Sequence, residues 1–292
     1  MSICNDRTVI ITGAGSGLGR AYALAFAAEG AHVLVNDIRL EAAEAVVAEV
    51  AAAGGKAIAN NGDITTMAGA QSIIDATLAA FGEVHVLVNN AGILRDKSFA
   101  KMSLDEFRLV VDVHLMGSVI CTKAVWDGMR ERNHGRIVMT TSSSGLYGNF
   151  GQSNYGAAKM ALVGLMQTLA IEGAKNNVKV NCLAPTARTA MTEKLLPPQA
   201  LELLKPEFVS PALLALVADD APTRTILGAG AGGVEAAHVT LTRGISILGM
   251  DDLEAASVIL ARLAEIADPA TAIIPASGLE QGQVELGKAL GG

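Results

Sequence analysis

A tyrosine and a lysine that lie one helical turn apart, Tyr155 and Lys159, are the clearest candidates for chemistry in this sequence. Residues four positions apart on a helix share a face and come close together. Free tyrosine titrates near ~10, so a tyrosine that transfers protons at neutral pH needs a lower pKa, which a fixed positive charge provides. The spacing therefore predicts a tyrosine acid/base beside an ammonium group. A chance pair on a solvated helix face shows the same pattern, so the motif needs support from elsewhere in the chain.

Ser142 precedes this pair and offers a hydroxyl that can hydrogen-bond the same substrate oxygen. It follows Arg136–Thr140, an apolar and β-branched run that predicts a strand. A serine in such a place is also an ordinary turn residue. Its neighbours Ser143 and Ser144 keep that alternative open.

The first strand candidate, Thr8–Ile11, runs into a glycine-rich turn. Glycines let the backbone turn tightly and approach a pyrophosphate, whose charge then meets the free N–H groups at the start of the next helix. That helix follows at once, with small and apolar residues on one face. A glycine-rich turn is often only a loop. Its position between a strand and an amphipathic helix predicts a nucleotide site formed by Gly13, Ser16, Gly17, Leu18 and Gly19.

Asp37 follows the second strand candidate, His32–Asn36. A carboxylate at this place can accept both hydroxyls of an adenosine ribose and repel a 2′-phosphate, which favours NAD over NADP. Arg39 is the competing feature, because an arginine turned inward could hold that phosphate; we expect it on the solvent side. Asp37 also suits a cap for the helix that begins near Leu40, and the two roles are compatible.

Strand and helix patterns alternate along most of the chain. Strands are also expected over Lys56–Ala59, Val84–Val88 and Val178–Leu183, and helices over Ala42–Ala53, Gln71–Phe81, Ser103–Arg130 with Ser103 as its cap, and Ala157–Ile171. This alternation predicts βαβ units whose strands all end at one edge of a parallel sheet. The expected fold class is α/β: a doubly wound, Rossmann-like parallel sheet of about seven strands flanked by helices, with a C-terminal helical extension.

The last third of the chain is less regular. Thr186–Pro206 is proline-rich and is expected to form a mobile flap over the substrate. We expect strands at Thr225–Leu227 and Val239–Leu241, an irregular Gly228–Gly233 and a capped helix over Asp251–Ala267. The end from Asp268 to Gly292 is expected either to be a loose tail or to wrap a partner subunit. The predicted organisation is one dinucleotide-binding and catalytic domain over residues 1–245. Residues 246–292 would be part of that domain or an oligomer contact.

Composition excludes several classes of function. The chain has 292 residues, of which 51% are hydrophobic, enough for a large core in one α/β domain. Its net charge of -7 and the lack of a basic run argue against nucleic acid as a partner. Cys4, Cys121 and Cys182 are odd in number and widely spaced, which predicts reduced thiols and no metal site. No apolar run has the length of a signal peptide or a membrane span, so we expect a soluble, cytoplasmic protein.

Together, these motifs resemble the short-chain dehydrogenase/reductase family over residues 5–245. The glycine-rich turn matches the family's TGxxxGxG loop, and its later motifs match Asp63, Asn89-Asn90-Ala91-Gly92, Ser142, Tyr155, Lys159 and Asn181–Pro185. A closer resemblance, carried by Asn89–Phe99 and Gly145–Gln152, is to the (3R)-hydroxyacyl-CoA dehydrogenase part of peroxisomal multifunctional enzyme type 2, also called 17β-hydroxysteroid dehydrogenase type 4, and its bacterial relatives.

The resemblance implies a role for each matching residue. Tyr155 would be the general acid/base, Ser142 would hold the substrate oxygen, and Lys159 would bind the nicotinamide ribose and lower the pKa of Tyr155. The implied dinucleotide contacts also include Asp63, Ile64, Asn90, Ala91, Gly92 and Pro185.

Two departures from the family pattern matter. His114 stands on the long helix where the family usually has Asn, so His114 itself would have to hold the water of the proton relay. A lone histidine is more often a satisfied core residue. Thr186 replaces the usual Gly after Pro185, so contacts to the nicotinamide amide fall to Thr189 or Thr192.

We therefore expect an NAD-dependent oxidoreductase that interconverts a secondary alcohol and a ketone on a lipid-like substrate. The leading substrates are a 3-hydroxyacyl-CoA thioester and a (17β-)hydroxysteroid. The alternative is a non-catalytic dinucleotide sensor on the same fold, since a fold does not fix a function. The presence of Ser142, Tyr155 and Lys159 together counts against the sensor.

The Tyr155 helix also predicts an oligomer. It carries more apolar or small residues than packing on its own sheet needs, namely Ala161, Leu162, Leu165, Met166 and Leu169. We expect a homodimer or homotetramer built through this helix and the long helix before Arg136–Thr140. Members of the family commonly pair through these helices.

Overall fold

A computed structural model of the chain describes residues 3–188 and 198–290. It divides into two compact units, Met1–Ala236 and Ala237–Gly292. The strands form one sheet, in the order β3-β2-β1-β4-β5-β6-β7-β8. Their bounds are β1 (Thr8–Ile11), β2 (His32–Asn36), β3 (Lys56–Asn60), β4 (Val86–Asn89), β5 (Gly135–Thr140), β6 (Val178–Pro185), β7 (Ile226–Gly230) and β8 (Gly233–Ala237).

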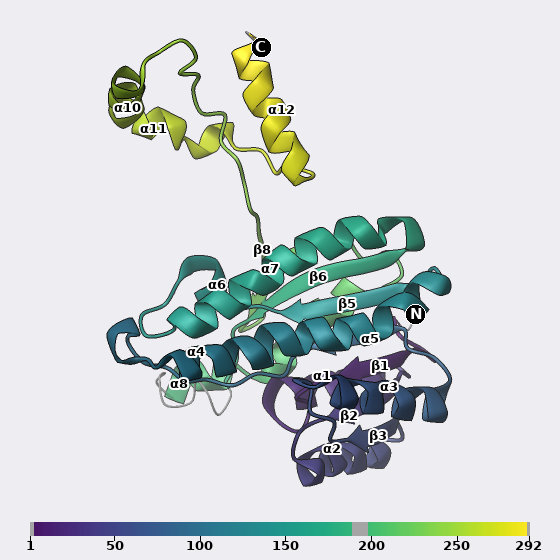
Figure 1. Cartoon of the computed structure of the whole chain (residues 1–292). Coiled ribbons are helices and arrows are strands. Elements are labelled where there is room, and N and C mark those ends of the chain that lie inside the picture. Colours follow the sequence, from purple (N-terminus) through teal and green to yellow (C-terminus); the bar gives the residue numbers. More distant parts are fainter. Residues whose placement is uncertain (1–2, 189–197, 291–292) are drawn as a thin grey trace. The chain divides into compact units, whose positions relative to one another are not determined.

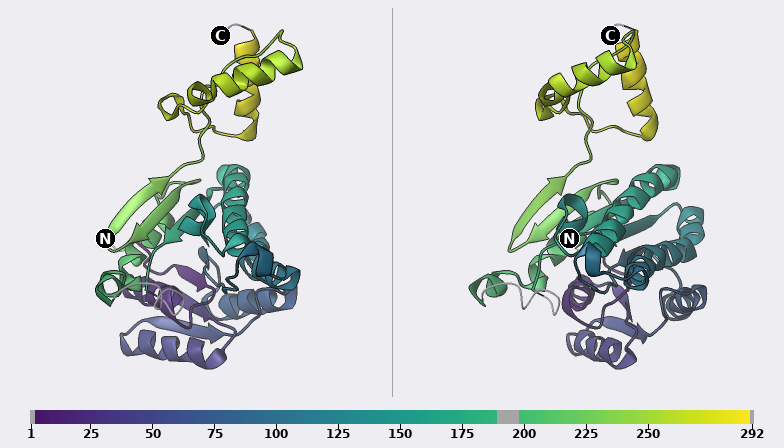
Figure 2. Two further views of the ribbon diagram at one scale, coloured as in Figure 1. Left: turned by 90° about the vertical axis from the view of Figure 1, so that its left-hand side faces the viewer. Right: turned by 60° about the vertical axis from the view of Figure 1, so that its left-hand side comes forward.

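Helices of the larger unit lie on both faces of this sheet (Figure 1, Figure 2). They are α1 (Gly17–Ala28), α2 (Leu40–Ala52), α3 (Met67–Phe81), α4 (Leu104–Val111), α5 (Gly117–Glu131), α6 (Ser143–Tyr147), α7 (Ser153–Gly173), α8 (Pro198–Leu203) and α9 (Ser210–Val217). Short turns of other helix types are Phe99–Lys101, Asp112–Met116, Ala174–Asn176 and Pro206–Phe208.

The β-branched runs make the buried strands. Alternate side chains along a strand point to opposite faces, so each central strand serves two helical layers. One face packs with α1 and α9 in a continuous core that includes Val9, Ile11, Val33, Val35, Val86, Val88, Val138 and Leu183. All three cysteines are free and buried.

The parallel sheet places the motifs as expected. Parallel pairing runs from β3 through β2, β1, β4, β5 and β6 to β7. β1 lies between β2 and β4, so the connections diverge there, and the carboxyl ends of these strands border the crevice in which such folds bind ligands. The glycine-rich turn, Asp37 and Asn90 follow β1, β2 and β4 at this edge.

The expected long helix before β5 is confirmed, with one irregularity. Ser103 caps α4 in a capping box with Glu106, and a π-helical turn, Asp112–Met116, joins α4 to α5. By length and composition the continuous helix Leu104–Glu131 is apolar enough to cross a membrane. Its contacts with α3, α7, β4 and β5 account for much of that apolar content.

The glycine-rich segment after β6 is more regular than its composition suggests. β7 extends through Gly230 and turns into β8, so the eighth strand is Gly233–Ala237 and not Val239–Leu241. The connecting residues Ala231 and Gly232 have φ values of 51° and 82°. Two positive φ values are typical of a tight type I′ hairpin, so β8 runs antiparallel to β7. The glycine at 232 therefore helps this strand pair to form.

The smaller unit contains α10 (Asp252–Ala261), α11 (Leu263–Ile266), a turn at Pro269–Thr271 and α12 (Gly278–Ala289). Asp251 caps α10 as expected, accepting hydrogen bonds from the N–H groups of Leu253 and Glu254 at 3.0 and 2.9 Å. The expectation of a loose tail after Asp268 is wrong, because α12 forms despite its glycines. Residues 189–197 of the expected flap over Thr186–Pro206 lie outside the described residues, and its later part contains α8.

Candidate active site

Three elements bring the predicted catalytic side chains together. Ser142 follows β5 as the N-cap of α6, and α7 carries Tyr155 and Lys159. The Lys159 ammonium lies 5.5 Å from the centre of the Tyr155 ring. Ser142 makes a side-chain hydrogen bond to Tyr155, and its Oγ also accepts the Ser144 N–H at 3.2 Å. Ser142 is thus both a turn-capping serine and a neighbour of the phenol.

Lys159 is buried at the end of β5 with 3% of its surface exposed. Its Nζ donates to the backbone oxygen of Thr140 at 2.5 Å, and the Thr141 hydroxyl donates to the backbone oxygen of Lys159 at 2.7 Å. Burial lowers the pKa of the Lys159 ammonium from 10.5 to about 7. The lysine therefore titrates close to neutral pH in the protein alone.

The structure corrects one expectation about Tyr155. Burial raises the pKa of its phenol, the Ser142 hydrogen bond lowers it, and the nearby Asp96 carboxylate raises it further; the net direction is upward. Lys159 was expected to lower this pKa. The Lys159 charge is not among the causes of this shift, and burial, which disfavours the phenolate, is the largest of them.

His114 lies beside the tyrosine, in the π-helical turn. The two rings meet edge to face with centres 5.1 Å apart, and His114 Nε2 lies 3.0 Å from the N–H of Ile93 and 2.8 Å from its oxygen. Burial and the Lys159 charge lower the pKa of His114 to about 3. The imidazole is therefore neutral at physiological pH, and within the described residues its buried Nδ1 has no hydrogen-bond partner.

Sequence reasoning missed a set of polar contacts that hold two loops beside Tyr155. Gln152 Nε2 donates to Asp96 at 2.7 Å, and its Oε1 accepts from the Ser144 hydroxyl at 2.7 Å. Asn154 Nδ2 donates to the oxygen of Arg95 at 3.2 Å. The two segments that these contacts join, residues 95–96 and 152–154, are far apart in sequence. The only sequence signal for their contact was that each segment lies next to a motif of the family.

The glycine-rich turn is closed by contacts from β4. The Thr12 hydroxyl accepts the N–H groups of Asn90 and Ala91 at 3.0 and 3.1 Å, and Asn90 Nδ2 donates to the oxygens of Thr12 and Gly13. Gly13 has a φ of 62°, and a Cβ there would lie 2.6 Å from the Ala91 backbone. The turn therefore requires glycine, which packs β1 and β4 closely at the crevice.

The start of α1 fits a phosphate group. Ser16 is its N-cap, yet no side chain caps the helix, so backbone N–H groups around Gly17, Leu18 and Gly19 are available to an anion. Gly17 has a φ of 55°, and a Cβ on Gly19 would lie 2.4 Å from the Gly13 oxygen. A side chain at either position would disturb the turn that presents these donors.

Asp37 is placed to receive a ribose. It is 8% exposed, and its two oxygens accept the N–H groups of Gly15 and Arg39 at 3.1 and 3.0 Å. A carboxylate has about four acceptor sites, so capacity remains for hydroxyl donors. The Arg39 side chain is 66% exposed, with Nε 3.6 Å from Asp37, which confirms its expected place on the solvent side.

The other predicted dinucleotide residues are distributed along the same edge. Asp63 accepts from the N–H and hydroxyl of Thr65, which orders the turn after β3. Ile64 is buried against Gly117, Gly92 lies against the His114 ring, and Pro185 ends β6. Thr189 and Thr192 lie outside the described residues.

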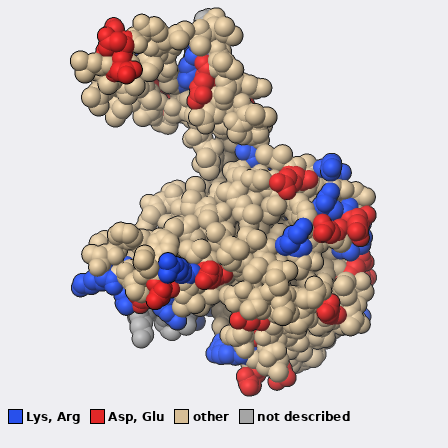
Figure 3. Space-filling model, in the orientation of Figure 1, with Lys and Arg blue, Asp and Glu red and all other residues tan. Residues whose placement is uncertain are grey.

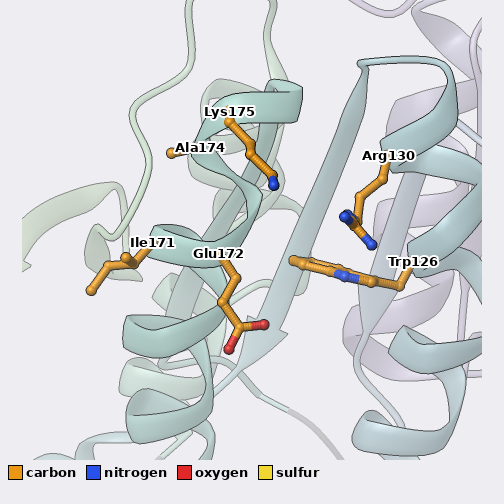
Figure 4. Close-up of a pocket in the computed structure, with 6 residues that line it drawn as sticks. All are labelled: Trp126, Arg130, Ile171, Glu172, Ala174 and Lys175. Atoms are coloured by element: carbon orange, nitrogen blue, oxygen red, sulfur yellow. The ribbon is translucent and has the colours of Figure 1, made fainter.

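A separate hollow of about 540 Å³ lies between the carboxyl ends of α5 and α7. Trp126 and Arg130 line it from α5, and Ile171, Glu172 and Lys175 line it from the end of α7 and the following turn (Figure 4). Because α5 ends just before β5 begins, this hollow lies at the amino edge of the strands, away from Ser142. It is not part of the catalytic group.

The arrangement suits a dinucleotide with a reactive end near Tyr155. The close-approach glycines, the uncapped start of α1 and the free acceptor capacity of Asp37 match a pyrophosphate and a ribose. Comparison with known proteins agrees, because the family model for short chain dehydrogenases matches residues 7–200. The chain belongs to the short-chain dehydrogenase family. It is therefore an oxidoreductase, and the non-catalytic sensor is not supported.

Three relatives show the range of this likeness. A short-chain type dehydrogenase/reductase of Mycobacterium tuberculosis is 46% identical over 90% of this chain and 94% of its own. Mouse peroxisomal multifunctional enzyme type 2 is 50% identical over 73% of this chain, which spans only 30% of that enzyme. A 3-oxoacyl-[acyl-carrier-protein] reductase of Synechocystis is 40% identical over 76% of this chain and 93% of its own. The resemblance predicted from the motifs is thus confirmed.

A solved structure extends the comparison. The 7α-hydroxysteroid dehydrogenase complexed with NADH and 7-oxo glycochenodeoxycholic acid is 29% identical, with a TM-score of 0.74. The match covers 80% of this dehydrogenase and 96% of that chain. The relatives therefore include proteins named for acyl and for steroid substrates.

The buried lysine generates a prediction about stability. Unfolded Lys159 keeps its proton up to pH 10.5 and the folded protein only up to about pH 7, so unfolding takes up a proton between these values. The free-energy cost of burying Lys159 is therefore largest below about pH 7 and decreases as the pH rises toward 10.5. Lys159→Met should raise the free energy of unfolding by ~1–4 kcal/mol near neutral pH, with a smaller gain in alkaline buffer.

Urea unfolding followed by circular dichroism at neutral and alkaline pH measures this difference. Lys175→Met, which removes an exposed lysine, is the matched control and should show no pH-dependent gain. A gain from Lys159→Met that grew with pH would contradict the prediction.

Proposed function

We propose that this dehydrogenase interconverts a secondary alcohol and a ketone on a lipid-like substrate, with NAD as the preferred cofactor and a 3-hydroxyacyl thioester as the leading substrate. The observation that carries the proposal is the convergence of Ser142, Tyr155 and Lys159 beside the dinucleotide crevice. A hydroxysteroid is the second candidate, favoured by the likeness to the 7α-hydroxysteroid dehydrogenase.

The chain's own groups divide the proton chemistry between them. Bound NAD supplies the hydride acceptor. Ser142 orients the substrate oxygen by hydrogen bonding, and Tyr155 takes the hydroxyl proton during oxidation or returns it during reduction. Lys159 places an ammonium near the Tyr155 ring, and this charge, which is complete only below about pH 7, favours the phenolate that forms during reduction, although burial keeps the net pKa of the phenol raised. His114 serves as a neutral positioning residue that supports the Tyr155 ring and the Gly92–Ile93 backbone.

Two relatives support an acyl substrate. The Synechocystis relative is named for 3-oxoacyl reduction, and the likeness to it covers nearly all of its chain. The mouse relative is named as a peroxisomal multifunctional enzyme. The sequence resemblance around Asn89–Phe99 and Gly145–Gln152 points to the dehydrogenase part of that enzyme.

Tyr155→Phe tests the proposal at its centre. Purified wild-type protein should oxidise a 3-hydroxyacyl-CoA, with NADH absorbance as the readout, in a panel that includes hydroxysteroids. Tyr155→Phe should lower kcat by ~10²- to 10⁴-fold, because only the proton-transferring hydroxyl is lost, while NADH affinity stays nearly unchanged. Ser142→Ala should also lose activity, whereas Ser143→Ala, at the exposed neighbouring position, should not. More than a tenth of the wild-type rate in Tyr155→Phe would remove the tyrosine from this role.

Asp37 generates a prediction about cofactor choice. A 2′-phosphate ~4 Å from the carboxylate would be repelled by ~1 kcal/mol in water and ~4 kcal/mol at a partly shielded site. The wild type should therefore prefer NAD over NADP by tens- to hundreds-fold in kcat/KM, and Asp37→Ala should reduce that ratio. Asp37→Asn keeps an acceptor without the charge and separates the two effects, while Asp75→Ala on the exposed side of α3 is the control. An unchanged ratio in both Asp37 variants would refute the assignment.

We also propose a homo-oligomer built through α5 and α7. Leu162 and Met166 are buried in the core of the subunit. Other apolar or small residues of α7 remain accessible: Ala161, Leu165 and Leu169 are half-buried, and Met160 and Ile171 are 40% and 50% exposed. Figure 3 shows an uncharged surface over the middle of these helices, with charged side chains gathered toward its right-hand side. Such a face suits association between copies of the chain.

Light scattering at micromolar concentration should give a dimer or tetramer. Ile171→Glu should weaken it because a charge would be placed in an apolar contact. Leu78→Glu, at an exposed position on α3, should leave the molar mass unchanged. A monomeric wild type would refute the proposal.

A further inference from the structure

Three exposed aromatic side chains lie on the two chain segments that the Asp96–Gln152 hydrogen bond joins near Tyr155. They are Phe99, Tyr147 and Phe150, which are 75%, 76% and 90% exposed, and we call them the aromatic rim. Only one other large aromatic residue in the described part of the chain, Phe208, is exposed. Exposed aromatic surface costs free energy in water, so its concentration at one place calls for a ligand or partner.

The rim is held by an ordered polar framework. The Asp96–Gln152 hydrogen bond ties the loop before Phe99 to the loop after Phe150. The N–H of Lys97 also donates to the oxygen of Gly151 at 2.9 Å. The Asn154 contact to the Arg95 oxygen closes the framework on the side of the catalytic helix. The polar groups of the two loops are therefore turned toward each other, while the aromatic side chains are left in solvent.

The segments that carry the rim adjoin the elements that hold the reacting groups. Ser142 caps the start of α6 and Tyr147 ends it, and the loop that carries Phe150 leads into α7 just before Tyr155. The loop that carries Asp96 is fixed against the same segment and lies close enough to influence the phenol of Tyr155. A chain attached to the carbon that reacts at Tyr155 would leave the site past these loops.

We propose that the aromatic rim binds the apolar chain of the substrate and gives this dehydrogenase a preference for long chains. The inference deepens the proposed function and rests on it for the identity of the chain. Continuity with Ser142 and Tyr155 favours a substrate chain over a second protein copy, because α6 runs from Ser142 to Tyr147 and the loop that carries Phe150 leads into the helix of Tyr155.

Calorimetric binding of palmitoyl-CoA and acetyl-CoA in the presence of NADH tests the proposal without turnover. Wild-type protein should bind the long-chain thioester more tightly. Phe150→Ala and Phe99→Ala should each weaken palmitoyl-CoA binding by ~10-fold, and acetyl-CoA binding by less than ~2-fold, because only the chain contacts are lost. Phe150→Leu keeps an apolar contact and should restore most of the affinity. Leu78→Ala, an exposed apolar residue on α3, is the control.

The outcomes separate this proposal from the function on which it rests. Equal affinity of the wild type for both thioesters, or equal losses for both in the variants, would overturn the rim as a chain site. A fall in molar mass by light scattering in Phe150→Ala would show a subunit contact and would also overturn it. Chain-dependent binding without oxidation of any 3-hydroxyacyl-CoA would uphold the rim and refute the proposed reaction.

Discussion

The burial of one ammonium group, that of Lys159, is the constraint on which the active site depends. The charge sits at the end of β5, covered by α7, with the Thr140 oxygen as its backbone partner. Close contact between α6 and α7 is needed to exclude water there, and a Cβ on Gly145 would lie 2.8 Å from the Cβ of Lys159. The extensive core between the sheet and its helices supplies the stability that offsets this burial, a common relation between active sites and the rest of a fold.

A second close approach builds the dinucleotide side of the crevice. Thr12 and Asn90 join the ends of β1 and β4 through side-chain hydrogen bonds, so the glycine-rich turn is fixed before any ligand arrives. Asp37, at the end of the neighbouring strand β2, similarly accepts the Gly15 N–H. The ribose acceptor and the phosphate-binding turn are thus parts of one hydrogen-bonded structure, which limits the conformational entropy lost when a dinucleotide binds.

Much of this arrangement could be predicted from sequence because its signals are local. Thr8–Ile11 and the following glycines indicate a strand and a turn, and the four-residue step from Tyr155 to Lys159 places both on one helix face. The direction of the Tyr155 pKa could not be predicted in the same way, because it depends on burial and on Asp96, which only the folded chain brings near. The Asp96–Gln152 contact is equally non-local.

Glycine content was a poor guide to secondary structure for a different reason. Gly228–Gly233 was expected to be irregular, yet positive φ at Ala231 and Gly232 is what lets β7 return as β8. In α12 the glycines at 278, 282 and 287 lower helix propensity, but the helix still forms with a Gln281–Glu285 hydrogen bond one turn apart.

The exchange of asparagine for histidine at position 114 follows from the same electrostatics as the buried lysine. A Cβ on Gly92 would lie 2.2 Å from the His114 ring, so the imidazole fits only because that residue is glycine. A charged imidazole there would repel the Lys159 ammonium, but burial and that ammonium lower the pKa of His114 to about 3. The ring is consequently neutral, as an amide would be, and can support Tyr155 and Ile93 without competing for the charge that the phenolate needs.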